Sequence, residues 1–222
     1  MSDFLRVTIT LSSPMVEPDN LLHLDGLLAA LRVRQAEAAT AEPVDPLQVQ
    51  HDIPLERYTS PSGEWVFKAS AFQLQRETET RMWMQTGRTD LVRVAEDRQS
   101  GLLKLRTSKP NLAGGPFKSS AYHYPVLWAC LVAFCVGDKQ AIENLLKDCD
   151  QIGGRRGVGS GKIQSIEVSA IQEMDCNWMY RAMPVDAANL KGQGEYAQAM
   201  KGLRPPYWDR TKHLPVLTPL NF

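Results

Sequence analysis

The chain has 222 residues, of which 43% are apolar and 23% charged, and its formal net charge at pH 7 is zero. These values are ordinary for a folded soluble protein, and the zero net charge argues against a generally basic coat for nucleic acid. The longest apolar run, VLWACLVAFCV, has 11 residues, whereas a membrane-spanning helix needs about 20. The N-terminus lacks a basic region followed by an apolar one, so we expect no secretory signal, no membrane partner and a cytoplasmic location.

The charges are unevenly distributed along the chain. Residues 1–60 carry four Lys and Arg against nine Asp and Glu, whereas residues 101–162 carry nine against four. The basic stretch is compatible with a local anion-binding face and equally with an ordinary solvated surface.

The cysteines follow no metal-binding pattern. They form no Cys-x-x-Cys pair, and no histidine lies at zinc-ligand spacing from any of them. We therefore expect buried, reduced thiols, no metal site and no cofactor. The four residues are Cys130, Cys135, Cys149 and Cys176.

The chain begins with a predicted strand and a predicted helix. Residues 4–13 alternate apolar and polar side chains, which is typical of a half-buried strand. Residues 20–38 carry leucines at helical spacing and predict a helix that Asp19 or Asn20 caps. Gly26 is a tolerated interruption of this helix.

The next part of the chain is less regular. A proline-rich loop is expected at residues 40–54, and the alternation of residues 63–75 predicts a second strand. Residues 76–99 fit the core pattern poorly, and we interpret them as an extended hairpin or finger. Residues 104–125 are turn-rich, basic and contain several aromatic side chains.

The second half repeats the order of the first. Residues 126–136 predict a buried strand and residues 138–150 a helix. A glycine-rich loop at residues 152–161 leads to a last core strand at residues 162–170. The order β-α-β, insertion, β-α-β predicts an α+β fold of the ferredoxin-like type. Such a fold has a four-stranded antiparallel sheet with two helices on one face.

The prediction divides the chain into a domain and a tail. The ferredoxin-like domain is expected at residues 1–176 and includes an insertion at residues 76–125. The tail at residues 177–222 is rich in proline and glycine, so we expect it to be irregular and to wrap around the domain.

The loop sequence GGRRGVGSGK is not a nucleotide-binding motif. Arg156 stands where a P-loop needs its first glycine, and Ile163 replaces the magnesium-binding hydroxyl. Gly157, Gly159 and Gly161 merely alternate, so the dinucleotide-binding pattern also fails. The loop also follows a predicted helix and precedes a predicted strand, which is the reverse of both nucleotide-binding arrangements.

The same loop is suited to hold a polyanion. Glycines have no Cβ and let a phosphate backbone approach the main-chain N–H groups closely. Arg155 and Arg156 add forked contacts to phosphate oxygens, and Lys162 adds a point charge. We interpret the loop as a clamp for single-stranded RNA; the alternative is a mobile turn with solvated arginines.

At this point the chain resembles a known family. The loop IGGRRGVGSGKI, between a helix and the last strand, resembles the mark of the repeat-associated mysterious proteins (RAMPs), RNA-binding subunits of CRISPR effector complexes. LHLDGLLAAL (22–31) and PLERY with GEWVFKASAF (54–72) look like the Csf-type subunit of type IV systems. The resemblance covers most of residues 5–170, and the tail has no motif that matches.

The resemblance implies a non-catalytic subunit that grips the 5′ handle of the crRNA and helps to nucleate the backbone filament for interference. Its implied partners are crRNA, the backbone RAMP subunits and the large subunit. Target DNA is an indirect partner, and an accessory helicase is a further candidate. Within LHLDG we expect a structural role, with Leu22 and Leu24 facing the core and Asp25 acting as a local cap.

The resemblance also implies which residues contact RNA. It makes residues 76–99 the thumb of these subunits, which lies along the guide or wedges between its bases; the alternative is a small local core. The residues concerned are Gly153, Gly154, Arg155, Arg156, Gly157, Gly159, Gly161 and Lys162 in the loop, Met82, Trp83 and Met84 in the thumb, and Tyr122 with His123.

The second hypothesis is a metal-independent endoribonuclease that processes pre-crRNA. In the segment KSSAYHY, His123 is the candidate acid or base, and Lys118 would stabilise the charged phosphate. No second histidine or paired carboxylate stands near His123 in the sequence, and Tyr122 and Tyr124 equally suit stacking on bases. The sequence therefore favours a scaffold that binds RNA without cutting it.

Overall fold

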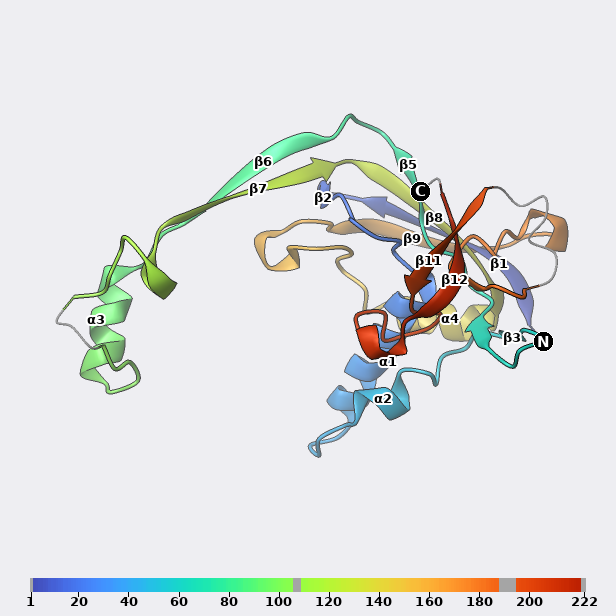
Figure 1. The fold of residues 1–222 in the computed structure, drawn as a ribbon, viewed down its shortest axis with the longest axis horizontal. Coiled ribbons are helices and arrows are strands. Elements are labelled where there is room, and N and C mark those ends of the chain that lie inside the picture. The colour runs from blue at the N-terminus through green and yellow to red at the C-terminus, as the bar shows by residue number, and fades with distance from the viewer. Residues whose placement is uncertain (1, 106–108, 188–194, 221–222) are drawn as a thin grey trace. The chain divides into compact units, whose positions relative to one another are not determined.

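The computed structural model describes residues 2–105, 109–187 and 195–220 (Figure 1). The chain divides into two compact units, which we call the main unit (residues 1–79 and 127–222) and the inserted unit (residues 80–126). Both combine helices with antiparallel strands, so the fold is mixed α+β. No helix in the described ranges is long and apolar enough to cross a membrane.

A four-stranded antiparallel sheet forms the centre of the main unit. Its strands are β1 (Asp3–Leu11), β5 (Gln73–Arg76), β8 (Ala129–Gly137) and β9 (Ile163–Ala170), and their order across the sheet is β5-β8-β1-β9. β1, the first of these four strands in the chain, therefore lies between β8 and β9, the last two of the four. The strands predicted at residues 4–13, 126–136 and 162–170 are confirmed within a few residues.

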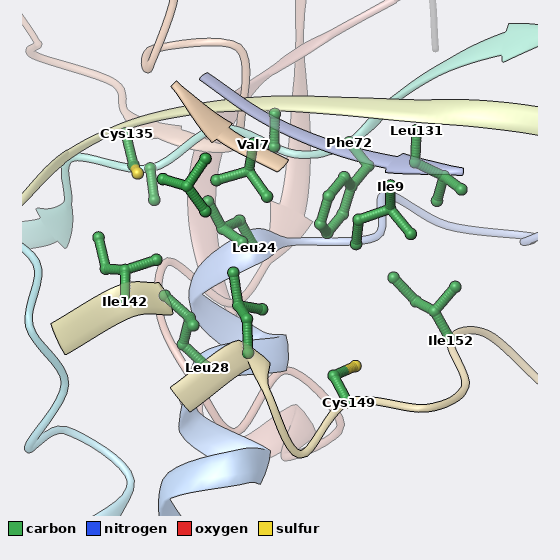
Figure 2. Close-up of a cluster of buried hydrophobic side chains, with 14 of the residues drawn as sticks. Val7, Ile9, Leu24, Leu28, Phe72, Leu131, Cys135, Ile142, Cys149 and Ile152 are labelled. Carbon is green, nitrogen blue, oxygen red and sulfur yellow. The ribbon is translucent and has the colours of Figure 1, made fainter. Parts of the chain in front are cut away.

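Two helices cover one face of this sheet. The alternation of β1 buries Leu5, Val7 and Ile9 completely on a single face. Buried side chains of α1 (Leu24–Ala39) and α4 (Lys139–Leu146) join the same cluster. Figure 2 shows these side chains meeting below the strands. Asp138 caps α4 by accepting a hydrogen bond from the backbone N–H of Ala141.

The first helix begins later than predicted. His23, rather than Asp19 or Asn20, occupies the N-cap position of α1. The preceding residues are extended because they pair with another segment: Phe72 N–H donates to the carbonyl of Leu22, and Leu24 N–H donates to that of Ser70. A tertiary contact, not local propensity, decides where this helix starts.

The predicted loop and second strand are each more complex than expected. Within the loop, α2 (Pro46–Val49) forms one turn that Asp45 caps. The strand expected at residues 63–75 is two strands, β4 (Trp65–Phe67) and β5. They separate because β4 pairs with β3 (Arg57–Thr59), whereas β5 pairs with β8.

The inserted unit contains a hairpin whose second strand lies outside the segment predicted to form one. β6 (Arg81–Gly87) pairs with β7 (Ser120–Leu127), and α3 (Leu91–Gln99) follows β6 in the chain. Of the two alternatives for residues 76–99, a hairpin or a finger, a hairpin formed by this segment alone is wrong, because β6 pairs with residues 120–127. After β6 the chain turns into α3 at Asp90. Asp90 caps this helix, since its side chain accepts hydrogen bonds from the backbone N–H groups of Val92 and Arg93.

The tail is not irregular. It forms a three-stranded sheet in the order β10-β12-β11, and a second apolar cluster forms between this sheet and Val66 of β4. The expectation of an irregular tail is wrong because its prolines and glycines conceal short alternating stretches. The strands are β10 (Met183–Pro184), β11 (Tyr196–Lys201) and β12 (Leu214–Pro219).

The remaining short elements are β2 (Met15–Val16) and four 3₁₀ turns. The turns are η1 (Gly115–Phe117), η2 (Arg156–Val158), η3 (Glu173–Asp175) and η4 (Arg210–Lys212). All four cysteines are free thiols; Cys135 and Cys149 are buried as expected, whereas Cys130 and Cys176 are half-buried. Burial raises the pKa of the Cys176 thiol to about 11.

Candidate nucleic-acid interface

The glycine-rich loop is closed at its base by strand-like pairing. Ile152 N–H donates to the carbonyl of Gly161 at 2.9 Å, and Ile163 N–H donates to that of Asp150 at the same distance. These bonds hold residues 150–152, which follow α4, against residues 161–163 at the start of β9. The loop therefore projects from a fixed base.

A second set of bonds attaches the loop to the segment after β1. Gly161 N–H donates to the carbonyl of Pro14 at 2.9 Å, and Ser13 Oγ donates to that of Gly159 at 2.8 Å. Ser160 is buried, and its Oγ accepts from Val16 N–H at 3.1 Å. Since the N–H groups of Gly159, Gly161 and Lys162 all bond within the fold, they hold the loop and are not donors for a ligand.

Gly161 is required by the fold itself. Its φ is +66°, and a Cβ at this position would lie 1.9 Å from the carbonyl oxygen of Ile152. Gly153 and Gly159 also have φ near +85°, a region that side chains disfavour. Gly157 differs, because its φ is ordinary and a Cβ there would meet no atom within 4 Å.

The exposed part of the loop, residues 154–158, carries both arginines; we call it the loop tip. Arg155 has φ +58° and is the one non-glycine residue with a positive φ in the described ranges. Such a conformation costs free energy and persists only where the surroundings impose it. Arg156 begins η2, whose bonds run from Val158 and Gly159 back to the carbonyls of the two arginines. Two exposed cations thus project from a loop with a defined backbone.

Met82, Trp83 and Met84, which were expected to act together as a wedge, are divided between the two faces of the hairpin in the inserted unit. Trp83 lies opposite Tyr124, and Gln85 lies opposite Tyr122, so these four share one face. The Tyr122 and Tyr124 rings are nearly parallel, with centroids 6.3 Å apart. Residues 82 and 84 belong to the other face, because neighbouring side chains of a strand alternate.

Four apolar side chains of the hairpin are exposed, whereas Tyr124, Val126 and Leu127 of β7 are buried. The exposed fractions are 64% for Met82, 40% for Trp83, 56% for Met84 and 48% for Tyr122. The alternative of a small local core at residues 82–84 is therefore wrong. Residues 80–126 carry eight Lys and Arg against three Asp and Glu, so these aromatic side chains belong to a basic unit. Exposed aromatics with nearby cations are typical of single-stranded nucleic-acid binding.

The two candidate catalytic residues occupy different kinds of position. His123 is an exposed residue of β7, directly opposite Met84 and on the face away from Tyr122 and Tyr124. Lys118 precedes β7 and terminates η1, with its backbone N–H bonded to the carbonyl of Gly115. The described residues contain no group of three or more His, Cys, Asp and Glu side chains positioned to hold a metal ion.

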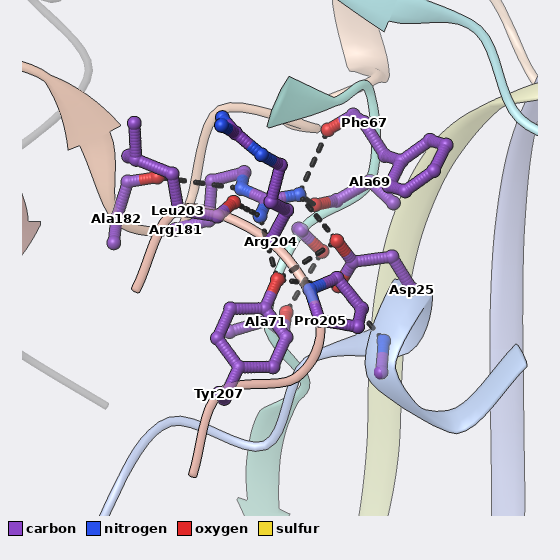
Figure 3. Close-up of polar contacts among 12 residues, drawn as sticks. Asp25, Phe67, Ala69, Ala71, Arg181, Ala182, Leu203, Arg204, Pro205 and Tyr207 are labelled. Atoms are coloured by element: carbon purple, nitrogen blue, oxygen red, sulfur yellow. Dashed lines mark hydrogen bonds and ion pairs between the residues drawn. The ribbon is translucent and has the colours of Figure 1, made fainter. Parts of the chain in front are cut away.

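Sequence reasoning missed a buried ion pair that connects α1 to the tail (Figure 3). Asp25 and Arg181 are both fully buried, and Arg181 Nη1 lies 3.1 Å from Asp25 Oδ2. The guanidinium also donates to the carbonyls of Phe67, Ala69 and Leu203 at 2.6–2.9 Å. Tyr207 Oη donates to the same carboxylate at 2.8 Å.

This cluster corrects the expected role of Asp25. The residue is not primarily a local cap, because its carboxylate binds side chains more than 150 residues away in sequence. Burial, reinforced by the Asp25 carboxylate, raises the pKa of the Tyr207 hydroxyl well above its usual value. A signal for the pair exists in the sequence, since Arg181 is the one charge in the apolar stretch WMYRAMPV and a buried charge needs a partner.

Gly26 also has a specific function in this packing. A Cβ at this position would lie 3.3 Å from the Tyr207 ring. The glycine is thus a point of close approach between α1 and the tail rather than a tolerated interruption.

Comparison with known families gives one result for nearly the whole chain. The family model described as "CRISPR type IV associated protein Csf3" matches residues 3–219. The match includes the tail, in which the sequence alone offered no recognisable motif. No curated protein matches the chain.

Proposed function

The chain belongs to the Csf3 family of CRISPR type IV associated proteins, and from this premise we propose that it holds crRNA without cutting it. Family membership makes the chain a subunit of a type IV CRISPR complex and thus a partner of other subunits. Our proposal is more specific: the subunit grips the 5′ handle of the guide and helps to nucleate the backbone filament. Contacts with the backbone and large subunits, an indirect contact with target DNA, and an accessory helicase belong to the same proposal.

The observation that carries the proposal is the contrast within the glycine-rich loop. Its base is fixed by hydrogen bonds to β9 and to residues 13–16, whereas Arg155 and Arg156 are exposed at the loop tip. Little conformational entropy is then lost when a ligand binds, because the backbone is already ordered. Two guanidinium groups on such a support suit the phosphates of single-stranded RNA.

We also propose that the sheet and its two helices form a ferredoxin-like RAMP domain. The strand order β5-β8-β1-β9 supports this, as do the connections through α1 and α4, whose buried faces share one core. The glycine-rich loop then joins the second helix to the last strand, where the family resemblance expects it.

The hairpin of the inserted unit provides the second RNA contact in this proposal. Trp83 and Tyr122 offer exposed rings on one face, on which unpaired bases stack. Base stacking tolerates any sequence, since every base has a π-face. The hairpin thus supplies affinity rather than sequence preference.

The decisive test replaces both loop-tip arginines. R155A/R156A should weaken binding of a labelled CRISPR-repeat RNA by a few kcal/mol, since charge-assisted hydrogen bonds contribute about 1.5–3 kcal/mol each. The dependence of affinity on salt should also become less steep, because fewer phosphates are neutralised. Fluorescence anisotropy at several salt concentrations measures both effects. The control K139A/R210A removes two cations outside the loop and should change affinity little; equal effects of the two double variants would contradict the clamp.

The same RNA distinguishes the scaffold from the endoribonuclease alternative. Incubation with the purified protein in EDTA should leave it intact, because His123 shares its hairpin face with Met82 and Met84, and the segment KSSAYHY has no second histidine or carboxylate. A product cut at one defined position that disappears in His123→Ala would instead establish metal-independent processing.

A further inference from the structure

An apolar groove of about 670 Å³ lies within the inserted unit, between α3 and the chain that follows it. Its helical side is lined by Leu91, Val94, Ala95 and Arg98. Their spacing of i, i+3, i+4 and i+7 places them on one face of α3. The other lining residues are Gln99, Leu105, Lys109, Pro110 and Leu112.

The helix beside this groove is held by hydrogen bonds at both ends. Asp90 caps its start, and just after its end Leu103 N–H donates to the carbonyl of Asp97 at 2.9 Å. The hydroxyl of Thr89 donates to the carbonyl of Phe117 at 2.7 Å, which connects the residue before the cap to η1. The position of α3 within the inserted unit is therefore defined.

The inserted unit does not bury the apolar face of α3. None of the nine residues of α3 is buried, and Leu91 is 50% exposed. Among the described residues of 80–126, only Tyr124 and Val126 are buried, and both belong to β7. So short a helix is marginal in water by itself, and a small unit without a core usually needs a partner to stay folded. The groove therefore needs an occupant that supplies apolar side chains.

The lining indicates the chemistry of this occupant. Six of its nine described residues have apolar side chains, and none is aromatic. Unpaired bases stack on aromatic rings, so an aliphatic lining suits a protein partner better than RNA. The charged residues of the lining, Arg98 and Lys109, are both cations, which favours acidic residues on the partner. The same groove of a second copy is disfavoured, because its cations would face these cations.

We propose that this groove docks an acidic, amphipathic helix of another subunit of the same complex. An apolar stripe at the spacing found on α3 packs against the ridges of a second helix. The docked helix inserts aliphatic side chains into the groove, and its Asp and Glu side chains lie near Arg98 and Lys109. Partner subunits exist because the chain belongs to a family of type IV CRISPR complex proteins. The inference rests on the proposed contacts with other subunits, to which it adds a surface and a partner chemistry, and it is independent of the RNA clamp.

Cross-linking in the assembled complex identifies the occupant directly. Full-length chains with Leu91→benzoylphenylalanine, which carries a photo-reactive ring, are co-expressed with the other subunits and the CRISPR RNA. Leu102→benzoylphenylalanine is the control, since Leu102 is 82% exposed and does not line the groove. Position 91 should cross-link to one segment of another subunit, with aliphatic residues at helical spacing and a net negative charge. Position 102 should not give this product.

Three cross-linking results would overturn the docking. Products of position 91 that contain RNA would assign the groove to the guide, and products that contain a second copy of this chain would assign it to self-association. A product with a basic segment of another subunit, or no product at all, would contradict the proposed partner chemistry.

A competition between chains measures how much the groove contributes. Wild-type and Leu91→Asp chains with different tags are co-expressed with the other subunits, and mass spectrometry gives their ratio in the purified complex. Leu91→Asp should be about ten-fold under-represented, because docking would bury its carboxylate against aliphatic side chains. Asp is favourable in the first turn of a helix, so α3 itself should be preserved. Leu102→Asp makes the same change in charge and should compete equally with the wild type.

A second pair of variants tests the acidic character of the partner. Lys109→Glu reverses a charge in the groove and should be under-represented about three-fold, as expected for one exposed ion pair. Lys104→Glu makes the same change at an exposed residue outside the groove and should compete equally with the wild type. Equal incorporation of Leu91→Asp or of Lys109→Glu would contradict the docking.

The isolated chain separates this inference from the proposed function. Leu91→Asp and Leu102→Asp should bind labelled CRISPR-repeat RNA with equal affinity, since they change the charge of the inserted unit equally. If Leu91→Asp alone loses affinity, the groove binds RNA and the docking is wrong, whereas the clamp still stands or falls with R155A/R156A. If even the wild-type chain does not join the complex, the proposed contacts between subunits fail and the docking fails with them.

Discussion

The arginine of the tail and the arginines of the loop tip occupy opposite environments. Arg181 is fully buried, and its guanidinium bonds to one carboxylate, one hydroxyl and several carbonyls. Arg155 and Arg156 are exposed. The same kind of side chain is therefore buried among its partners in one region and exposed to solvent in the other.

Burial decides between these two uses. Taking a charge out of water is costly unless a counter-charge and hydrogen bonds replace its hydration, so a buried arginine is committed to its partners. An exposed arginine remains hydrated and loses little when it exchanges water for phosphate. Substitutions at the two places should consequently change different quantities, namely the free energy of unfolding and the affinity for RNA.

The largest expected effect is that of Arg181→Ala on stability. The change leaves the Asp25 carboxylate buried without its counter-charge, which typically costs about 3–5 kcal/mol in the free energy of unfolding. Urea denaturation at neutral pH measures it. R155A/R156A is the matched control and should stay within about 0.5 kcal/mol of the wild type. A wild-type midpoint for Arg181→Ala would show that the buried pair does not hold the tail.

The next largest expected effect is the loss of stability in Gly161→Ala, compared with Gly157→Ala in the same loop. Gly161→Ala places a Cβ against the carbonyl of Ile152 at a φ of +66°, and we expect a loss of roughly 2–3 kcal/mol from strain. Gly157→Ala meets no atom within 4 Å and should change stability by less than about 0.5 kcal/mol. Similar losses in the two variants, measured by thermal unfolding, would contradict the distinction between loop base and loop tip.

The third prediction compares the RNA affinity of variants at two exposed apolar side chains of the hairpin, Trp83 and Met84. Trp83→Ala should weaken RNA binding by about 1–3 kcal/mol, the usual value for one base-stacking contact. Met84→Ala, on the opposite face of β6, should have a clearly smaller effect. Anisotropy titrations of both variants with the same RNA measure the difference. Equal losses would favour the wedge in which residues 82–84 act together.

The smallest expected effect concerns His23 and pH. Burial, Arg181 and Lys201 lower its pKa in the folded protein, and Tyr207 covers its ring. The unfolded chain therefore binds the proton more tightly, and stability should fall as pH drops below about 6.5, by at most about 1.4 kcal/mol per pH unit. Urea denaturation at about pH 7.5 and about pH 5.5 measures this contribution. His23→Phe keeps a ring against Tyr207, so the pH dependence of that variant should be shallower; an identical dependence would exclude His23 as its source.

Several features of the fold could be predicted because they depend on local sequence patterns. Alternation along residues 4–13 and 162–170 fixes which side chains can face a core, and a strand displays that pattern without help from its neighbours. The spacing of Ile142, Leu145 and Leu146 does the same for the helix that precedes the loop. The glycine-rich loop was recognisable because its residue types are unusual for a turn, and the family match is consistent with the resemblance drawn from it.

The features that join distant segments could not be predicted in this way. The carboxylate of Asp25 and the guanidinium of Arg181 are 156 positions apart, and β6 finds its partner strand beyond an intervening helix. A groove of about 600 Å³ beside the loop is formed only when residues 18–33, Gln50, the loop and residues 205–208 of the tail come together. Local propensity carries no information about such pairings, because each is stabilised by burial and hydrogen bonds that exist only once the chain has folded.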